Sequence, residues 1–274
     1  MIDLQVIPAL REDDCDQLDI GYVREFPRFG HSMKDVRRAG EVIAGELPWT
    51  DENQPEIRDA FQVANNWRDV HAYPMRSVRL QLAWYMRHCH IDGVTAARLK
   101  RMQAIRRKLR RLNMTMNQLQ DLGGCRAILP SIADVHNFVG ALRERSRHTV
   151  RAESNYISEP KKDGYRSHHL MFSYVGKGDA TFFDGRRVEV QIRTRLQHSW
   201  ATAVEAVGLL RREDLKGNQG NPRWLRLFKL MSAEFAVAEG CPEPPDVPSQ
   251  IARVAEIKAL DIELGAIKTL DEIS

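Results

Sequence analysis

The segment RRVEVQIRT, residues 186–194, constrains the fold most, because its apolar and polar residues alternate one by one. A period of two predicts a β-strand that packs one face on a core and leaves the other face for polar groups. The apolar row is Val188, Val190 and Ile192, and the polar row is Glu189, Gln191 and Arg193. Alternation alone does not separate a functional row from the solvent-facing side of an edge strand.

Three further segments have strand composition and are bounded by turn residues. They are CRAIL (125–129), TVRAESNYI (149–157) and HHLMFSYVG (168–176). Between the first two, SIADVHNFVGALRER (131–145) returns to helical spacing, with Ser131 as the predicted N-cap after Pro130. A strand, a helix and then closely spaced strands predict an α+β fold, namely a mixed β-sheet flanked by helices.

Helical patterns lie on both sides of these strands. The predicted helices are 32–46, 56–87, 96–112, 196–210 and 222–240, and a last helix follows the proline-rich segment 241–248 and ends at about Leu270. The helix 56–87 has a predicted break near Pro74, and Thr95 is the predicted N-cap of 96–112. We therefore predict three parts: a mainly helical N-terminal region (1–94), a core that contains the strands (95–215), and a C-terminal helical extension (216–274).

Composition is that of an ordinary globular protein and says little about partners. The chain has 274 residues, 43% of them hydrophobic and 28% charged, with a net charge of +4. The four cysteines are scattered without a CxxC pair, and the N-terminus lacks a signal-like pattern. We therefore expect a reduced, cytoplasmic setting. No apolar run approaches the roughly 20 residues that a membrane span needs, so no membrane partner is expected.

The strongest charge feature is RLKRMQAIRRKLRR, residues 98–111, which holds eight basic residues and no acidic one. If the segment is helical, an apolar stripe lies opposite a basic face. The stripe is Leu99, Met102, Ile105, Leu109 and Leu112, and the basic face is Lys100, Arg107, Lys108 and Arg111. Most charge runs are only solvated, but acids normally intersperse them. Their absence favours a polyanion, either nucleotide phosphates or an RNA backbone.

A candidate metal site rests on two carboxylates. Asp121 in QDLGGCRAIL precedes a double glycine and a strand that carries Arg126, although Asp-x-Gly-Gly is also a common turn. Glu189 supplies a second carboxylate. Two-carboxylate Mg²⁺ sites are a usual way to neutralise a triphosphate, so we expect Asp121 and Glu189 to share a Mg²⁺ ion.

The stretch EPKKDGYRSHH, residues 159–169, combines a flexible glycine, an aromatic ring and several cations. Gly164 lets the chain bend and Tyr165 offers a flat ring, while Lys161, Lys162 and Arg166 offer charge. A ring beside cations suits a nucleotide, whose base stacks while its phosphates pair. His169 follows near the entry to a strand, where a lone histidine is usually structural.

Together these motifs resemble the RelA/SpoT synthetase domain, the alarmone synthetase family. The resemblance covers about residues 95–210 in four segments: RLK…IRRKL, DLGGCR, PKKDGYRSHH and VEVQIRTRLQHSWA. That family transfers the β,γ-pyrophosphate of ATP to the 3′-hydroxyl of GDP or GTP, making (p)ppGpp, on a nucleotidyltransferase-like mixed sheet. Phosphoryl-type transfer needs mainly alignment and charge neutralisation, which cations and Mg²⁺ supply.

The resemblance implies a role for each matching residue. For ATP, Arg98 and Arg126 sandwich the adenine, and Lys100 and Lys108 bind the phosphates. Asp121 and Glu189 hold Mg²⁺, and Glu189 also activates the acceptor hydroxyl. The acceptor-binding residues are Tyr165, which stacks on the base, with Lys161, His169, Asp163, Gln191 and Arg193.

Departures from the family pattern leave the acceptor open. The family usually has Asn where Asp163 stands, and an acid accepts hydrogen bonds from guanine and from the amino group of adenine alike. The sequence contains no His-Asp dipeptide, so we do not expect the family's metal-dependent hydrolase domain. Some small synthetases of this family are toxins, paired with an antitoxin protein, that pyrophosphorylate the 3′ CCA end of tRNA and inhibit translation. Two alternatives to (p)ppGpp synthesis therefore stay open: this transfer to tRNA, and a non-catalytic RNA-binding module. A homo-oligomer also stays open as the state of assembly.

Overall fold

The fold is built on one five-stranded sheet in a computed structural model that describes residues 26–47 and 50–271. Its strands are β1 (Val94–Leu99), β2 (Gly123–Leu129), β3 (Thr149–Asn155), β4 (His168–Ser173) and β5 (Arg187–Thr194), in the order β1-β2-β5-β4-β3. The β2–β5 pair is parallel and the other pairs are antiparallel, which confirms the predicted mixed sheet. Since β5 is the central strand, its polar row does not lie on a sheet edge.

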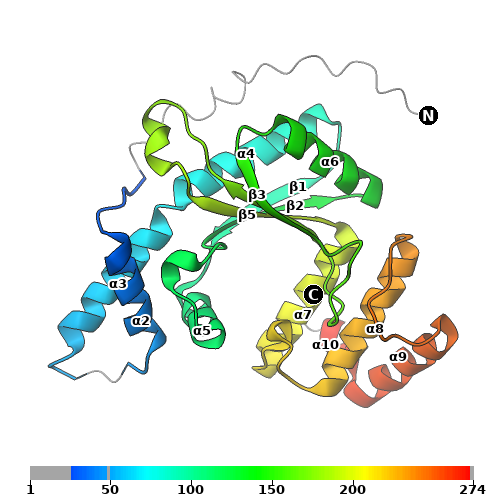
Figure 1. The fold of residues 1–274 in the computed structure, drawn as a ribbon. Coiled ribbons are helices and arrows are strands. Elements are labelled where there is room, and N and C mark those ends of the chain that lie inside the picture. The colour runs from blue at the N-terminus through cyan, green and yellow to red at the C-terminus, as the bar shows by residue number, and fades with distance from the viewer. Residues whose placement is uncertain (1–25, 48–49, 272–274) are drawn as a thin grey trace.

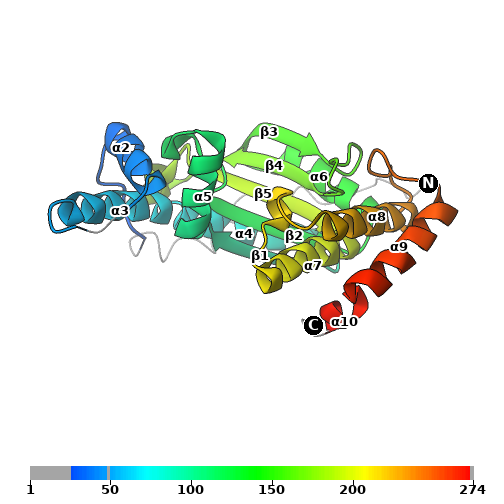
Figure 2. The ribbon, with the colours of Figure 1, turned by 90° about the horizontal axis from the view of Figure 1, so that it is seen from below.

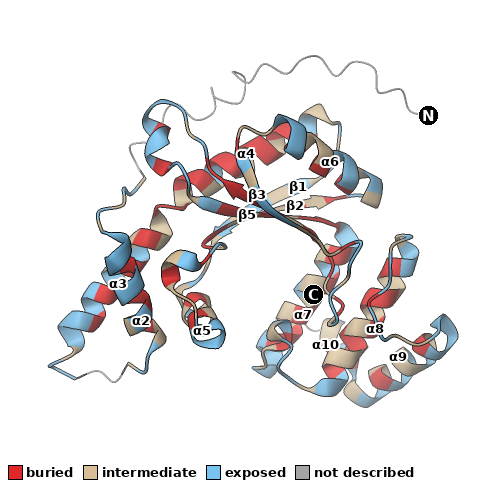
Figure 3. Ribbon diagram, viewed as in Figure 1, coloured by how far each residue is buried: buried red, intermediate tan, exposed pale blue. Residues whose placement is uncertain are grey.

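One face of the sheet packs on two helices, α4 (Ala72–His88) and α6 (Ile132–Arg145) (Figure 1). The apolar row of β5 is fully buried in this layer, as Figure 3 shows for the sheet and both helices. Helix α6 begins as predicted, because the Ser131 side chain accepts a hydrogen bond from the Asp134 backbone N–H. Burial of the apolar row fixes which face of β5 remains for polar side chains.

In the part of the chain that the structure describes, the opposite face of the sheet has helices only at its two ends (Figures 1 and 2). Helix α5 (Met102–Leu112) lies at one end, with α2 (Met33–Ala44) and α3 (Gln54–Asp69) beside it. Helices α7 (Arg195–Arg211) and α8 (Pro222–Ala238) lie at the other end, followed by α9 (Gln250–Leu264) and α10 (Ala266–Asp271). Short 3₁₀ turns are η2 (Met116–Gln118), η3 (Gly178–Phe183) and η4 (Leu215–Gly217).

The predicted start of the basic helix is wrong. Thr95 does not cap a helix but lies in β1, which pairs antiparallel with β2, and α5 begins only at Met102. Pairing with β2 fixes this segment as a strand, although its sequence also fits a helical pattern. Leu99 and Lys100 consequently precede α5, and Leu112 is exposed, so the buried part of the stripe reduces to Ile105 and Leu109.

Two other helix predictions need smaller corrections. The break in 56–87 falls between α3 and α4, at residues 70–71, and Pro74 sits in the first turn of α4. A proline is tolerated there because first-turn N–H groups have no intrahelical partner. The last predicted helix is two helices, α9 and α10, separated at Gly265, whose φ is +59°.

The remaining helix and strand predictions agree with the structure within a few residues at each end. The predicted division at residues 95 and 215 stays a prediction. One hydrophobic core joins α2 through β5, and a second joins α7, α8, α9 and α10. No helix in the described ranges combines the length and apolarity needed to cross a bilayer. Residues 1–25 of the predicted N-terminal region, including Cys15, lie outside the described residues.

Candidate functional site

Strand register places the polar side chains of four strands on the uncovered face of the sheet. Arg98 of β1 stands opposite Gly124 of β2, which stands opposite Glu189 of β5. In the next row, Arg126 stands opposite Gln191, and Gln191 opposite His169 of β4. Residues that pair across neighbouring strands share a face, so these two rows form the floor of the site.

The two consecutive glycines of β2 serve opposite faces. A side chain at Gly123 would meet His71 and Met75 of the packed layer, at 3.4 Å from its Cβ. Among the described residues, a Cβ at Gly124 would find only the Arg98 backbone oxygen within 4 Å, at 3.8 Å. Gly124 therefore leaves an open space on the floor between the strand positions of Arg98 and Glu189.

Asp121 holds two lysines at one end of this floor. Its Oδ2 accepts from Lys100 Nζ at 2.8 Å and from Lys108 Nζ at 2.9 Å. Burial by itself would raise the pKa of Asp121, but the two ammonium groups outweigh it and lower that pKa. Asp214 in turn lies 3.7 Å from Arg107. The basic segment 98–111 therefore pairs with acidic residues from other parts of the chain, namely Asp121 and Asp214.

A continuous chain of polar contacts runs through the second row. The Tyr165 hydroxyl lies 2.8 Å from His169 Nε2, and His169 Nδ1 lies 3.2 Å from Glu189 Oε1. Gln191 Nε2 donates to Glu189 Oε2 at 2.9 Å, and Arg193 donates to Gln191 Oε1 at 2.6 Å. The histidine tautomer with hydrogen on Nδ1 can donate to Glu189 while accepting from Tyr165.

Glu189 is held ionised by its neighbours. Burial would raise its pKa, but the hydrogen bond and charge of His169 and the hydrogen bond from Gln191 lower it. The charge of Asp121 acts in the opposite direction and raises the same pKa. Arg193 is buried, and this lowers its pKa to about 10, so it stays charged at neutral pH.

The carboxylate pair fits a hydrated magnesium ion. Within residues 26–47 and 50–271, no three His, Cys, Asp or Glu side chains gather to hold a metal unaided. Mg²⁺ usually keeps several waters and takes only one or two protein carboxylates beside substrate phosphates. Asp121 Oδ1 is buried and has no hydrogen-bond partner in the described chain, so it has a lone pair to offer.

Aromatic rings gather on the side of Glu189 away from the lysines. The Tyr165 ring lies 6.1 Å from Tyr156, 5.7 Å from His169 and 6.4 Å from Trp200, measured between centroids. Lys161 Nζ stands over the Tyr156 ring at 4.2 Å. Tyr165 is half-buried rather than part of the core, and burial raises its pKa, which keeps the phenol neutral.

Asp163 has a local role in the described structure. Its Oδ1 accepts a hydrogen bond from the Tyr165 backbone N–H at 2.9 Å and so shapes the loop that carries the ring. The adjacent histidines also separate. His168 is buried on the packed side with Glu153, whereas His169 joins the site.

Three further residues lie at the site without having been predicted from the sequence. Tyr156 follows β3, and its place at the end of a strand candidate was the only available signal. Glu205 of α7 has a pKa that burial would raise, but its hydrogen bond with Lys216 and the charges of Lys216, Arg98 and Arg126 lower it. Lys216 in η4 carries no sequence signal, because only folding brings it to Glu205.

Residues 97–209 match the family described as "Region found in RelA / SpoT proteins". The chain is thus similar to that family over residues 97–209, which we call the RelA/SpoT region. This region spans most of the floor, the carboxylate pair and the Tyr165 loop. Figure 2 shows the same strands from the uncovered side.

Relatives of known activity support this assignment. Over 169 residues the chain is 27% identical to GTP pyrophosphokinase of Escherichia coli (strain K12), which covers 58% of the chain and 21% of that relative. It is 31% identical over 134 residues to GTP pyrophosphokinase YjbM of Bacillus subtilis (strain 168), covering 47% of the chain and 61% of the relative. The chain thus spans only about a fifth of the length of the E. coli relative.

Solved structures share the fold. Small alarmone synthetase 1 from Bacillus subtilis, solved with its product pppGpp, superposes with a TM-score of 0.52 at 25% identity, over 64% of this chain and 92% of that one. A GTP pyrophosphokinase family protein from Streptococcus pneumoniae gives 0.53 at 20% identity, over 74% and 96%, which supports the fold alone.

Proposed function

We propose that the chain is a Mg²⁺-dependent pyrophosphotransferase that moves the β,γ-pyrophosphate of ATP to the 3′-hydroxyl of GDP or GTP. The observation that carries the proposal is the chain of polar contacts that joins the Tyr165 hydroxyl to the Glu189 carboxylate through His169. The resemblance of residues 97–209 to the RelA/SpoT region, and the named relatives, support the same reaction.

On the ATP side, the open space above Gly124 lies between β1 and β5 and beside two guanidinium groups, those of Arg98 and Arg126. Planar guanidinium groups stack on aromatic bases, so this space suits adenine. Lys100 and Lys108 carry the charge that a triphosphate needs. Asp121 holds both ammonium groups in place until the phosphates arrive.

On the acceptor side, Glu189 takes the proton from the 3′-hydroxyl. The hydroxyl oxygen then bonds to the β-phosphorus of ATP, the bond from that phosphorus to the bridging α-phosphate oxygen breaks, and AMP leaves. His169 and Gln191 fix the carboxylate, and its lowered pKa keeps it in the base form at neutral pH. Bound Mg²⁺, held by Asp121 and Glu189, would neutralise the charge on the transferred phosphates.

The test is transfer of label from γ-labelled ATP to GDP, GTP or deacylated tRNA by the purified chain. We expect label on GDP or GTP, and label on none of the three contradicts the proposal. Glu189→Gln should reduce transfer by about 100-fold or more, because it removes both the base and one Mg²⁺ ligand, whereas ATP measured without Mg²⁺ should bind within about twofold of wild type. Glu153→Gln, a carboxylate change away from the site on β3, is the control and should leave transfer unchanged.

A second candidate, transfer to the 3′ end of an RNA, is favoured by one observation. A hollow of about 600 Å³ on α5 is lined by Arg106, Arg107, Arg110 and Arg111, with Gln103, Asp214 and Gln219. Four guanidinium groups suit an RNA backbone. Label on tRNA with none on GDP or GTP would make RNA the acceptor. RNA binding with no transfer at all would favour the non-catalytic module.

A further inference from the structure

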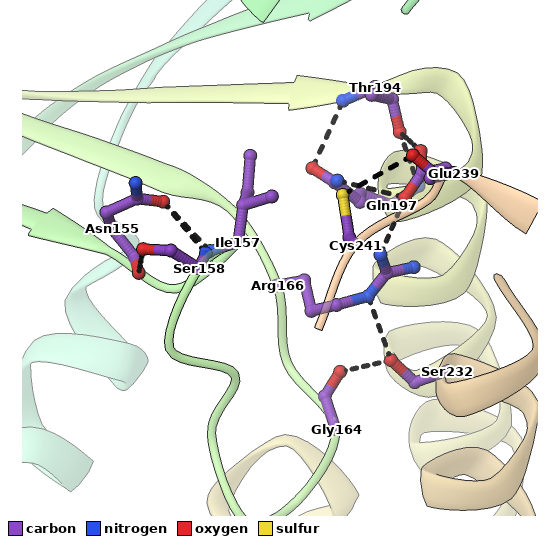
Figure 4. A network of polar contacts seen from close by, with 10 residues as sticks. All are labelled: Asn155, Ile157, Ser158, Gly164, Arg166, Thr194, Gln197, Ser232, Glu239 and Cys241. Atoms are coloured by element: carbon purple, nitrogen blue, oxygen red, sulfur yellow. Dashed lines mark hydrogen bonds and ion pairs between the residues drawn. The ribbon is translucent and has the colours of Figure 1, made fainter. Parts of the chain in front are cut away.

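The loop that carries Tyr165 rests on helix α8, which lies outside residues 97–209 (Figure 4). The Ser232 hydroxyl of α8 donates to the Gly164 backbone oxygen at 2.5 Å and accepts from Arg166 Nε at 3.3 Å. Gly164 has a φ of +93°, and a Cβ there would stand 3.0 Å from Ser232 Cβ. The loop thus approaches α8 as closely as a glycine permits, directly before the tyrosine.

A carboxylate just after α8 completes this junction. Glu239 accepts from Arg166 Nη1 at 2.6 Å, from Gln197 Nε2 at 3.1 Å and from the Thr194 hydroxyl. The Arg166 side chain is 2% exposed and that of Glu239 is 7% exposed. Thr194 ends β5, the strand of Glu189, and Gln197 lies in the first turn of α7. One buried carboxylate therefore joins the loop, the end of β5 and the start of α7.

We propose that Glu239 and Ser232 are positioning residues for the acceptor, so that the chain beyond the RelA/SpoT region is part of the acceptor site. This inference rests on the proposed function. The two side chains fix the residues on both sides of Tyr165 in the loop, namely Gly164 and Arg166. Neither takes part in the contacts around Lys100, Lys108 or Asp121, where ATP is placed.

The physical reason is that a buried ion pair tolerates little rearrangement. Removing the charge of Glu239 leaves the Arg166 guanidinium buried without compensation, which favours displacement of the loop. A ring that stacks on a base must be held in place, because a shift of about 1 Å can cost a large factor in reaction rate. The expected damage is therefore confined to the acceptor side.

The experiment compares Glu239→Gln and Ser232→Ala with the wild-type chain. We expect the KM and the dissociation constant for GDP or GTP to rise about tenfold in Glu239→Gln, in line with a lost charged hydrogen bond, and less in Ser232→Ala. The KM for ATP should change by less than about twofold, because the lysine cluster is untouched. Amide hydrogen exchange of peptides covering 156–167 should rise in both variants, independently of catalysis.

The matched control is Glu256→Gln, which breaks the ion pair between Arg226 of α8 and Glu256 of α9. It removes a carboxylate partner of α8 without touching the loop, so exchange in 156–167 and acceptor KM should stay at wild-type values. Unchanged exchange in Glu239→Gln would overturn the proposal. Equal losses for ATP and acceptor would also overturn it, because they indicate a general structural defect. If the wild-type chain transfers no label and binds neither GDP nor GTP, the acceptor role is wrong together with the proposed function. Raised exchange of 156–167 in Glu239→Gln would still show that α8 holds the loop in place.

Discussion

At the scale of single residues, the site depends on which way each side chain points from its strand. His168 and His169 are neighbours in sequence, yet one pairs with Glu153 among buried residues and the other joins Tyr165 to Glu189. Alternation along β4 separates them, because successive side chains of a strand point to opposite faces. The sequence predicted the acceptor role for His169 through the family motif, and its contact with Glu189 is visible only in the folded chain.

The ring and the hydroxyl of Tyr165 can be tested separately for their contributions to acceptor binding. Tyr165→Ala should raise the acceptor KM about tenfold, as expected for lost base stacking, with little change in ATP binding. Tyr165→Phe keeps the ring and loses only the contact with His169 Nε2, so acceptor KM should rise by less. Steady-state kinetics with GDP or GTP as varied substrate measure both. Equal losses for ATP and acceptor in Tyr165→Ala would remove the ring from the acceptor site.

At the scale of elements, the two adjacent glycines of strand β2 lie on opposite faces of the sheet. Gly123 faces the helix layer and Gly124 faces the open floor. The sequence alone does not determine which of the two glycines faces the helices. The same holds for the basic run, whose lysines are split between the end of β1 and α5 and meet again at Asp121. Sequence predicted a charged helix face, whereas strand pairing and a partner acid decided the actual arrangement.

The two glycines of β2 make a matched pair of variants. Gly124→Val should reduce transfer and weaken ATP binding by about tenfold or more, because the side chain fills the space between Arg98 and Glu189, while unfolding free energy stays within about 0.5 kcal/mol. Gly123→Val should lower the unfolding free energy by about 1–3 kcal/mol, since its methyl groups meet His71 and Met75. Urea unfolding and calorimetric titration with a non-hydrolysable ATP analogue measure the two effects. A Gly124→Val chain with unchanged ATP binding would contradict the placement of ATP.

At the scale of the whole molecule, the helices outside the RelA/SpoT region support both faces of the sheet. Helix α4 precedes the region and covers the packed face, while α8 follows it and holds the Tyr165 loop. The packed layers also bury histidines away from the site. His71 joins α3 to α4, and burial lowers its pKa to about 4, while burial lowers the pKa of His148 to about 3.

These two histidines predict a loss of stability in mild acid. Each binds a proton more readily in the unfolded chain, whose histidine pKa is near 6.5, so stability is complete above that pH and declines below it until the folded pKa is reached. Between pH 7 and pH 5 the unfolding free energy should fall by about 2 kcal/mol for each histidine. Urea unfolding at both pH values checks this. Equal stability at pH 7 and pH 5 would show that these side chains are not buried in the neutral form.

The sequence by itself determined the mixed sheet and the strand that carries the polar row Glu189, Gln191 and Arg193. It could do so because alternation, helix caps and turn residues act over a few neighbouring positions. It misplaced the start of α5, since strand pairing with a distant segment overrode local helical spacing. It missed Tyr156, Glu205 and Lys216 as parts of the site, because only folding brings them to their partners.

Only the tertiary structure decided how those residues meet. Asp121 binds Lys100 and Lys108, and Glu189 binds His169, across gaps in sequence that no local pattern spans. The ion pair between Glu239 and Arg166 joins two residues that are 73 positions apart in the sequence. Ion pairs and hydrogen bonds depend on distance in space, and strand pairing together with the packing of helices on the sheet sets those distances.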